Sequence, residues 1–464
     1  MDKGSILVKK TAIYAIGNFG SKILAYVMVL VYSYFITADE LGYYDLVLTT
    51  ISMLQPLVLF QINDGVYRYL VDSKKEERST IIGNGFSFLC LTTLLAEFLF
   101  LLVNFRLDIQ YAVWVGALFA STMFFVFLQD AVRGLGQSKL YAAMGVLNSV
   151  VMLLCEIVGL LLLRLGILAL LISKVIANVS CILVMLLCVP DMRSAAHHRV
   201  HYPMLLPLLK YSAPLVPNTI SWWVVNSSSR YIILGFLGAS FNGLFAMATK
   251  FPTILTTITS IFYLAWQESA IKEYHSPNRD QFFSDVFRKY YILLLTLCLC
   301  AVPATRFVIE LFVADEYKTA WQYTGFLYLG AVFSALCSFL GMGYQISKET
   351  ARSFSTTVFA AGLNILVNIG LIKMIGLHAA SIATFAAYLF LFFIRVKHTK
   401  RYFTLAVEWK TFCLLTSAVL GTIAVTAILP NLWLALPLCA LGAAFTLYMN
   451  RALFLPILSR IKKK

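Results

Sequence analysis

Two basic residues lie inside apolar segments that read as consecutive membrane-crossing helices. Arg230 lies in the first segment, 210–237, and Lys250 lies in the second, 244–266. Counted from the middle of the uncharged turn 238–243, each lies about ten residues into its helix, or ~15 Å at the rise of an α-helix. No acidic residue lies within one helical turn of either cation. A charge at that depth is costly unless it faces water, a partner or a substrate, so the pair predicts a site for an anionic ligand.

Polar side chains accompany the basic residues on three of the expected helices. Lys22 shares a helix face with Asn18, and hydroxyl and amide side chains flank Arg230 and Lys250 at similar spacing. Hydroxyls also hold membrane helices together, which is the alternative explanation for the Ser and Thr residues. For the three cations we favour a water-filled cavity. The candidate binding residues are Arg230, Lys250, Lys22, Asn18, Asn226, Asn218 and Arg306.

Other charges inside apolar segments have partners within reach. Glu156 and Lys174 fall at matching depth on adjacent antiparallel helices, whereas Arg306 and Glu310 lie one helical turn apart on the same helix. Opposite charges so placed form structural pairs; a proton relay, ion coupling or a substrate contact is the alternative. Asp45, near one end of the second expected helix, is a further candidate for ion coupling or structural pairing.

The chain is strongly apolar along its whole length. Of its 464 residues, 60% are hydrophobic and 13% are charged, and its mean hydropathy is +0.82. Apolar runs long enough to cross a bilayer recur throughout, which predicts an all-α polytopic membrane protein. About fourteen transmembrane helices are expected, at 12–36, 42–66, 81–103, 111–129, 142–163, 167–188, 210–237, 244–266, 288–313, 322–344, 355–373, 377–396, 411–429 and 432–455.

The positive charges support this topology. Lys and Arg gather in loops at alternate helix ends, and the loops assigned to the outside hold only Arg106, Arg164, Lys318 and Lys373. Such asymmetry predicts a multi-pass protein with both termini in the cytoplasm. The net charge of +15 therefore reflects membrane topology, and its distribution excludes nucleic acid as a partner.

An internal repeat divides the chain. One constant shift superposes Lys9 on Lys210 and Gly42 on Gly243. We therefore expect two six-helix lobes, related by pseudo-two-fold symmetry around a central cavity, followed by two C-terminal helices. The expected domains are an N-lobe with helices 1–6 (1–190), a cytoplasmic inter-lobe loop (191–209), a C-lobe with helices 7–12 (210–397), and appended helices 13–14 with a basic cytoplasmic tail (398–464).

Motifs for catalysis and for metal binding are missing from the sequence. No P-loop, HExxH, GxSxG or DxD-bearing soluble loop occurs, so ATP-driven transport and glycosyl transfer both lack their parts. The nine cysteines fall in apolar segments without a CxxC pair, and His197, His198 and His201 cluster without the other ligands of a zinc site. We therefore expect a protein that is not an enzyme and holds no cofactor or metal, with a proton or sodium gradient as the candidate energy source.

Three segments resemble signatures of polysaccharide transporters. SSSRYIILGFLGASFNGLFAMATKFPTIL, which contains Arg230 and Lys250, resembles the helix-seven/eight signature, and KKTAIYAIGNFGSKI with ITADELGYYDL resembles the N-terminal one. QDAVRGLGQSKLY, with Arg133 and Lys139, is similar to the inner loop after helix four. Together with the helix count, these segments resemble the polysaccharide flippase branch (O-antigen, capsule or teichoic-type) of the multidrug/oligosaccharidyl-lipid/polysaccharide exporter (MOP) superfamily.

The resemblance implies a function. Proteins of this branch flip undecaprenyl-diphosphate-linked oligosaccharide from the inner to the outer leaflet of the bacterial cytoplasmic (inner) membrane by alternating access, for surface polysaccharide biosynthesis. It implies that Arg230 and Lys250 occupy basic cavity positions and that Lys22 lies on the corresponding cavity helix. Ser229 stands where many relatives carry an Asp, which leaves ion coupling open. The implied partners are the lipid-linked oligosaccharide, membrane lipids, and a polysaccharide polymerase with other assembly proteins.

Three other functions remain as alternatives. A lipid II flippase of the same superfamily differs in its substrate. A cation-coupled multidrug exporter would use buried carboxylates to capture cationic drugs. The charged residues singled out here are basic instead, and they lack acidic sequence neighbours. A membrane-embedded polysaccharide polymerase or ligase would need a large outer loop, and no such loop is expected.

Overall fold

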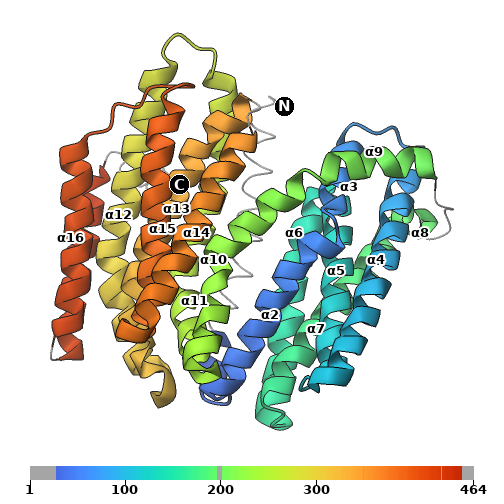
Figure 1. Cartoon of the computed structure of the whole chain (residues 1–464), viewed down its shortest axis with the longest axis horizontal. Helices are drawn as coiled ribbons and strands as arrows, with labels where there is room; N and C mark the ends of the chain where they lie inside the picture. Colours follow the sequence, from blue (N-terminus) through green and yellow to red (C-terminus); the bar gives the residue numbers. More distant parts are fainter. Residues whose placement is uncertain (1–27, 196–200, 348–349, 430, 452–464) are drawn as a thin grey trace, which may run out of the picture. The chain divides into compact units, whose positions relative to one another are not determined.

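The computed structural model describes residues 28–195, 201–347, 350–429 and 431–451 (Figure 1). Within these ranges all regular structure is helical. The chain forms two compact units, Met1–Trp223 and Val224–Lys464, and the division between them falls inside helix α10 (Leu215–Leu237). The all-α, multi-pass architecture expected from the hydropathy pattern is therefore confirmed.

The first unit contains the helices up to the start of α10. α5, α6 and α7 pack against one another, and α3 packs on α5. In α4 only 11% of the most apolar window is buried inside the protein. Large apolar side chains such as Leu94 and Phe105 are exposed, as expected for a helix that borders lipid. The helices are α2 (Ala38–Val58), α3 (Ile62–Val71), α4 (Arg78–Leu107), α5 (Ala112–Gly134), α6 (Ser138–Ile157) with a π-helical continuation (Val158–Leu162), α7 (Ile167–Cys188), α8 (Pro190–Ala195) and α9 (Tyr202–Ser212).

The expected span 42–66 is broken into α2 and α3, which are bent by 59° at the break. Phe60 and Gln61 between the two helices have φ angles of +50° and +53°, which lie outside the region of a right-handed helix. Pro56 has no amide hydrogen for the helix ladder, which weakens the last turn of α2. The expected span 42–66 therefore corresponds to two helices, which together are long and apolar enough to form one bent span.

The second unit is organised around α13, which is the most buried of its spans. In the span Asp315–Ile346, 83% of the most apolar window is buried, and α13 packs against α11, α12 and α15. α16 and α17 pack on α12. The elements are the rest of α10, α11 (Ala239–Glu273), α12 (Arg279–Phe312), the 3-10 helix η2 (Asp315–Tyr323), α13 (Thr324–Ile346), α14 (Thr350–Ile375), α15 (His378–Thr399), α16 (Trp409–Ile428), η3 (Leu432–Leu434) and α17 (Ala435–Met449).

The described residues contain eleven helices long and apolar enough to cross a membrane, or twelve when α2 and α3 count as one bent span. The first expected span, 12–36, lies mostly outside the described residues. α10 is not among the eleven, although its 23 residues extend ~35 Å, because polar side chains interrupt it. The total of about fourteen spans and the pseudo-two-fold symmetry stay predictions.

Candidate functional site

A single residue, Gly238, joins the two helices that carry the cations singled out in the sequence. Gly238 has a φ of +96°, which favours glycine, and its N–H donates to the carbonyl oxygen of Ile233 at 3.1 Å. The turn is therefore shorter than the expected loop 238–243. Arg230 and Lys250 lie ~12 and ~18 Å along their helices from Gly238. The two cations are thus offset by about one helical turn instead of sharing one depth.

Arg230 belongs to a hydrogen-bonded cluster on α10, α14 and α15, here called the α10 cluster. The Tyr388 hydroxyl on α15 donates to Oδ1 of Asn226 at 2.5 Å. Oγ of Ser228 donates to Oδ1 of Asn364 on α14 at 3.4 Å. Nη1 of Arg230 donates to the Asn226 carbonyl oxygen at 3.3 Å. The predicted residues Asn226 and Arg230 are therefore brought together, with partners from two distant helices.

The α10 cluster continues into a pair of buried amides on α14. Asn364 and Asn368 lie one helical turn apart, and both are 0% exposed. Nδ2 of Asn364 and both polar side-chain atoms of Asn368 have no hydrogen-bond partner among the described residues. Buried amides are costly unless their hydrogen bonds are satisfied, so these atoms are suited to water or to a hydroxyl-rich ligand. Sequence reasoning missed both, although two Asn residues at i, i+4 in an apolar helix are a readable signal.

α11 contributes an aromatic ring and a ladder of hydroxyls. The Arg230 guanidinium lies 6.0 Å from the centre of the Phe245 ring, a cation–π contact. Lys250 is half-buried further along the helix. The hydroxyls near it donate to carbonyl oxygens three or four residues earlier in α11, as Ser and Thr do within helices. These residues are Thr249, Thr253, Thr256, Thr257 and Ser260.

α15 also carries a fully buried arginine. Arg395 is 1% exposed, and its Nη1 donates to the Cys337 carbonyl oxygen on α13 at 2.7 Å. Its Nη2 donates to Oγ1 of Thr357 on α14 at 3.1 Å, and its guanidinium lies 5.7 Å from the Tyr344 ring centre. A Cβ at Gly341 would lie 2.9 Å from Nη1, so glycine leaves the space that the guanidinium occupies. Arg395 therefore ties α13, α14 and α15 together.

Arg306 contacts elements that do not carry the α10 cluster. Its Nε lies 2.8 Å from Oε1 of Glu310, one turn on along α12, which is the ion pair expected from their spacing. Nη1 donates to the Thr426 carbonyl oxygen on α16 at 2.5 Å, and the guanidinium lies 4.4 Å from the ring centre of Trp321. Among the described residues Arg306 thus joins α12, α16 and η2, and the structure does not bring it to Arg230.

The pair predicts a stability effect. Glu310→Ala removes the carboxylate that faces the buried Arg306 guanidinium, so we expect the free energy of unfolding to fall by about 1–3 kcal/mol. The check is the apparent melting temperature of the purified protein in detergent, with the exposed Glu76→Ala as the control. A melting temperature equal to that of the wild type would contradict the structural role.

Glu156 and Lys174 lie on α6 and α7 of the first unit. Glu156 is buried, and Nζ of Lys174 donates to Oδ1 of Asn148 at 3.5 Å. Nδ2 of Asn148 donates to Oδ1 of Asn178 at 3.0 Å, and Nδ2 of Asn178 donates to Oγ1 of Thr122 on α5 at 3.2 Å. This network joins three helices through two Asn residues that sequence reasoning missed. A direct pair between Glu156 and Lys174 stays a prediction.

The remaining predicted residues lie in or before the first unit. Asn218 is on the part of α10 that belongs to the first unit, and its Oδ1 is buried without a hydrogen-bond partner among the described residues. Asp45 is buried on α2. Lys22 and Asn18 lie outside the described residues, so their place in a cavity stays a prediction.

Metal ligands do not gather in the described part of the chain. No group of three His, Cys, Asp or Glu side chains there could hold a metal ion. His197 and His198 lie outside the described residues. The α10 cluster offers one guanidinium, amides and hydroxyls, which are groups that bind anions and hydroxyl-bearing ligands.

Known proteins resemble the chain in sequence and in fold. Residues 7–259 match the polysaccharide biosynthesis protein family. Among solved structures, the lipid II flippase MurJ in an inward closed conformation has a TM-score of 0.72 at 12% identity, covering 96% of this chain and 100% of MurJ. An inward-facing multidrug resistance MATE family transporter of the MOP superfamily has a TM-score of 0.66 at 11% identity, covering 84% of this chain and 95% of that one.

A third solved structure, the MATE transporter VcmN of Vibrio cholerae, has a TM-score of 0.61 at 12% identity and covers 85% of this chain and 95% of its own. Among curated protein sequences, none matches this chain significantly. Identities this low show the fold alone, and the family follows from the sequence match, which spans more than half of the chain. The chain is therefore a multi-pass membrane protein that belongs to the polysaccharide biosynthesis protein family.

Proposed function

We propose that this protein flips an undecaprenyl-diphosphate-linked oligosaccharide from the inner to the outer leaflet of the bacterial cytoplasmic membrane, by alternating access, for surface polysaccharide biosynthesis. The family supports a flippase. The observation that carries the proposed cargo is the α10 cluster, in which a cation, amides and hydroxyls from three helices lie side by side.

The chemistry of the α10 cluster fits both polar parts of this cargo. A diphosphate is a compact anion, and the planar guanidinium of Arg230 can contact two of its oxygens at once. Sugars carry hydroxyls that both donate and accept hydrogen bonds, as the amides of Asn226, Asn364 and Asn368 do. The apolar polyprenyl tail can stay in the bilayer.

The other sequence predictions extend this proposal. Further proposed cargo contacts are Lys250, Lys22, Asn18 and Asn218. Both chain termini are proposed to lie in the cytoplasm. A proton or sodium gradient is proposed as the energy source, and a polysaccharide polymerase as the partner that receives the flipped cargo. Arg306 is left out of the proposed cargo contacts because its described neighbours lie on α12, η2 and α16.

The test is a transport measurement on the purified full chain in liposomes with three cargos. An undecaprenyl-diphosphate oligosaccharide, lipid II and a cationic dye are each offered on one side, and an impermeant enzyme or quencher reports their arrival on the other. We expect transport of the oligosaccharide lipid above the protein-free rate and no transport of the dye. Transport of lipid II alone would assign the protein to that substrate, and transport of the dye alone would overturn the flippase proposal.

A further inference from the structure

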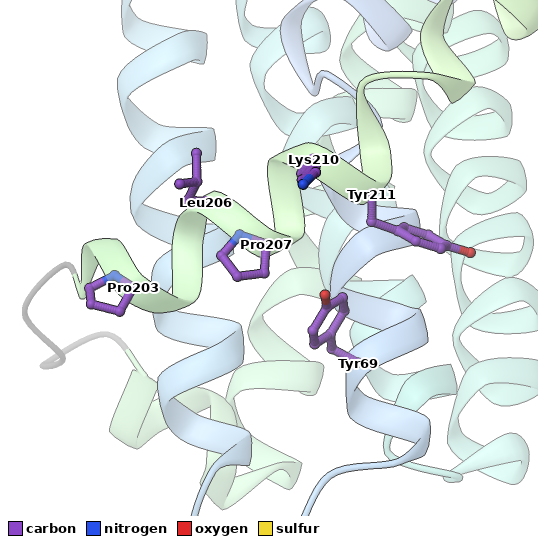
Figure 2. A pocket seen from close by; sticks show the side chains of 6 residues that line it. All are labelled: Tyr69, Pro203, Leu206, Pro207, Lys210 and Tyr211. Atoms are coloured by element: carbon purple, nitrogen blue, oxygen red, sulfur yellow. The ribbon is translucent and has the colours of Figure 1, made fainter.

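A groove of about 500 Å³ lies in the first unit between α3 and α9, and it shares no residue with the α10 cluster (Figure 2). Its size is within the range of pockets that hold small ligands. Its lining combines apolar and aromatic side chains with one cation: Tyr69, Pro203, Leu206, Pro207, Lys210 and Tyr211. No step of the proposed transport cycle uses these residues.

The inner side of α9 is held firmly against the unit. The backbone N–H of His201, just before α9, donates to Oδ1 of the buried Asn84 on α4 at 2.7 Å. Leu208 and Ser212 are 0% exposed on the inner face. A Cβ at Gly65 of α3 would lie 2.5 Å from the Ser212 hydroxyl oxygen, so the two helices approach as closely as glycine allows. The groove is therefore a built feature of the fold.

The outer side of α9 is apolar and exposed. Tyr202 is 76% exposed and Leu206 is 70% exposed, and Pro203 and Pro207 lie along the same side (Figure 2). A helix that packs one face on the protein and exposes an apolar face is stable at the boundary between lipid headgroups and acyl chains, because water does not cover the apolar face there. α9 is followed within three residues by α10, whose 23 residues extend ~35 Å.

The groove carries one positive charge. Lys210 is exposed and has no ion pair or hydrogen bond among the described residues. The rings of Tyr69 and Tyr211 line the same groove (Figure 2), 6.5 Å apart in an edge-on arrangement. Tyr rings and long basic side chains gather at the level of lipid headgroups, where the rings are half in apolar surroundings and the amine reaches phosphate.

We propose that this groove binds one anionic membrane phospholipid. Lys210 contacts the phosphate, the Tyr69 and Tyr211 rings flank the glycerol, and an acyl chain lies along Leu206 and Pro207. The match of a single cation to a single phosphate, next to an exposed apolar helix face, favours a lipid over a soluble anion or a peptide. A bound lipid would hold α9, and with it the segment that leads into α10.

The test measures lipid binding to the purified full chain, by native mass spectrometry or by the shift of its melting temperature. We expect saturable binding of phosphatidylglycerol and weaker binding of phosphatidylcholine, which carries no net charge. Lys210→Ala should weaken phosphatidylglycerol binding about fivefold, as expected for one basic residue at an anionic surface. Lys75→Ala removes an exposed charge outside the groove and should leave binding unchanged.

Leu206→Ser gives a second readout that folding cannot confound, because this side chain is largely exposed. It should weaken both phospholipids, whereas Lys210→Ala should weaken only the anionic one. Equal phosphatidylglycerol binding by wild type and Lys210→Ala would overturn the proposal. Displacement of phosphatidylglycerol by undecaprenyl phosphate at equal concentration would also overturn it, because the groove would then prefer the polyprenyl lipid. None of these readouts depends on transport.

Discussion

Arg230→Ala is expected to lower the rate of oligosaccharide-lipid flipping about 100-fold at subsaturating substrate. The guanidinium supplies charge-assisted hydrogen bonds to the diphosphate, and losing about 3 kcal/mol of such contacts corresponds to that factor. Asn226 and Tyr388 hold the α10 cluster together without Arg230, so the variant should still fold. Flipping is measured in liposomes and as surface polymer in a strain without its own flippase.

Two further variants separate charge from geometry at this position. Arg230→Lys keeps the charge but loses the planar two-point contact with the diphosphate, so the flipping rate should fall about tenfold. Arg106→Ala removes an exposed positive charge near the end of α4 and should flip at the wild-type rate. Wild-type surface polymer from a well-expressed Arg230→Ala would rule out the α10 cluster as the diphosphate site.

Arg395→Ala is expected to destabilise the protein by about 3–5 kcal/mol. The substitution removes the hydrogen bonds to Cys337 and Thr357 and leaves an empty volume between α13, α14 and α15. Buried polar groups that lose a partner and cavities that cannot collapse both raise the cost. The apparent melting temperature in detergent and the yield of monodisperse protein report the effect, with heating rate held constant because unfolding is a rate process.

The same helix supplies the control for Arg395. Lys397 lies two residues further on and is exposed, so Lys397→Ala should melt like the wild type. Arg395→Lys should fall between, because an amine cannot reproduce the contacts of the guanidinium fork. If Arg395→Ala and Lys397→Ala melted together, Arg395 would not be what holds α13, α14 and α15 in place.

Hydropathy was sufficient to predict the helical class of the protein. A span of apolar residues must hydrogen-bond its backbone internally in a bilayer, so each long run can only become a helix. The residues of the segment around Arg230 and Lys250 also carried the resemblance that the family match confirms. Spacing along one helix predicted the contact of Arg306 with Glu310, because residues one turn apart meet whatever the tertiary fold.

Contacts between helices could not be read from the sequence. The partners of Asn226 and Ser228 are Tyr388 and Asn364, which lie more than a hundred residues away on α15 and α14. The spacing of residues along one helix does not specify which helices become neighbours. The α10 cluster could therefore be identified only from the packing of the helices in the structure. The offset between Arg230 and Lys250 likewise depended on where the turn at Gly238 ends.

Two basic residues at the end of α15, Arg395 and Lys397, differ in a property that only the tertiary structure decides, namely which of them is buried. In the sequence, Arg395 lies at the end of the expected span 377–396 and Lys397 lies directly after that span. The tertiary structure buries Arg395 against α13 and leaves Lys397 exposed. Two residues apart on a helix, side chains point to different faces, and only the packing of α13 and α14 determines which face becomes the interior.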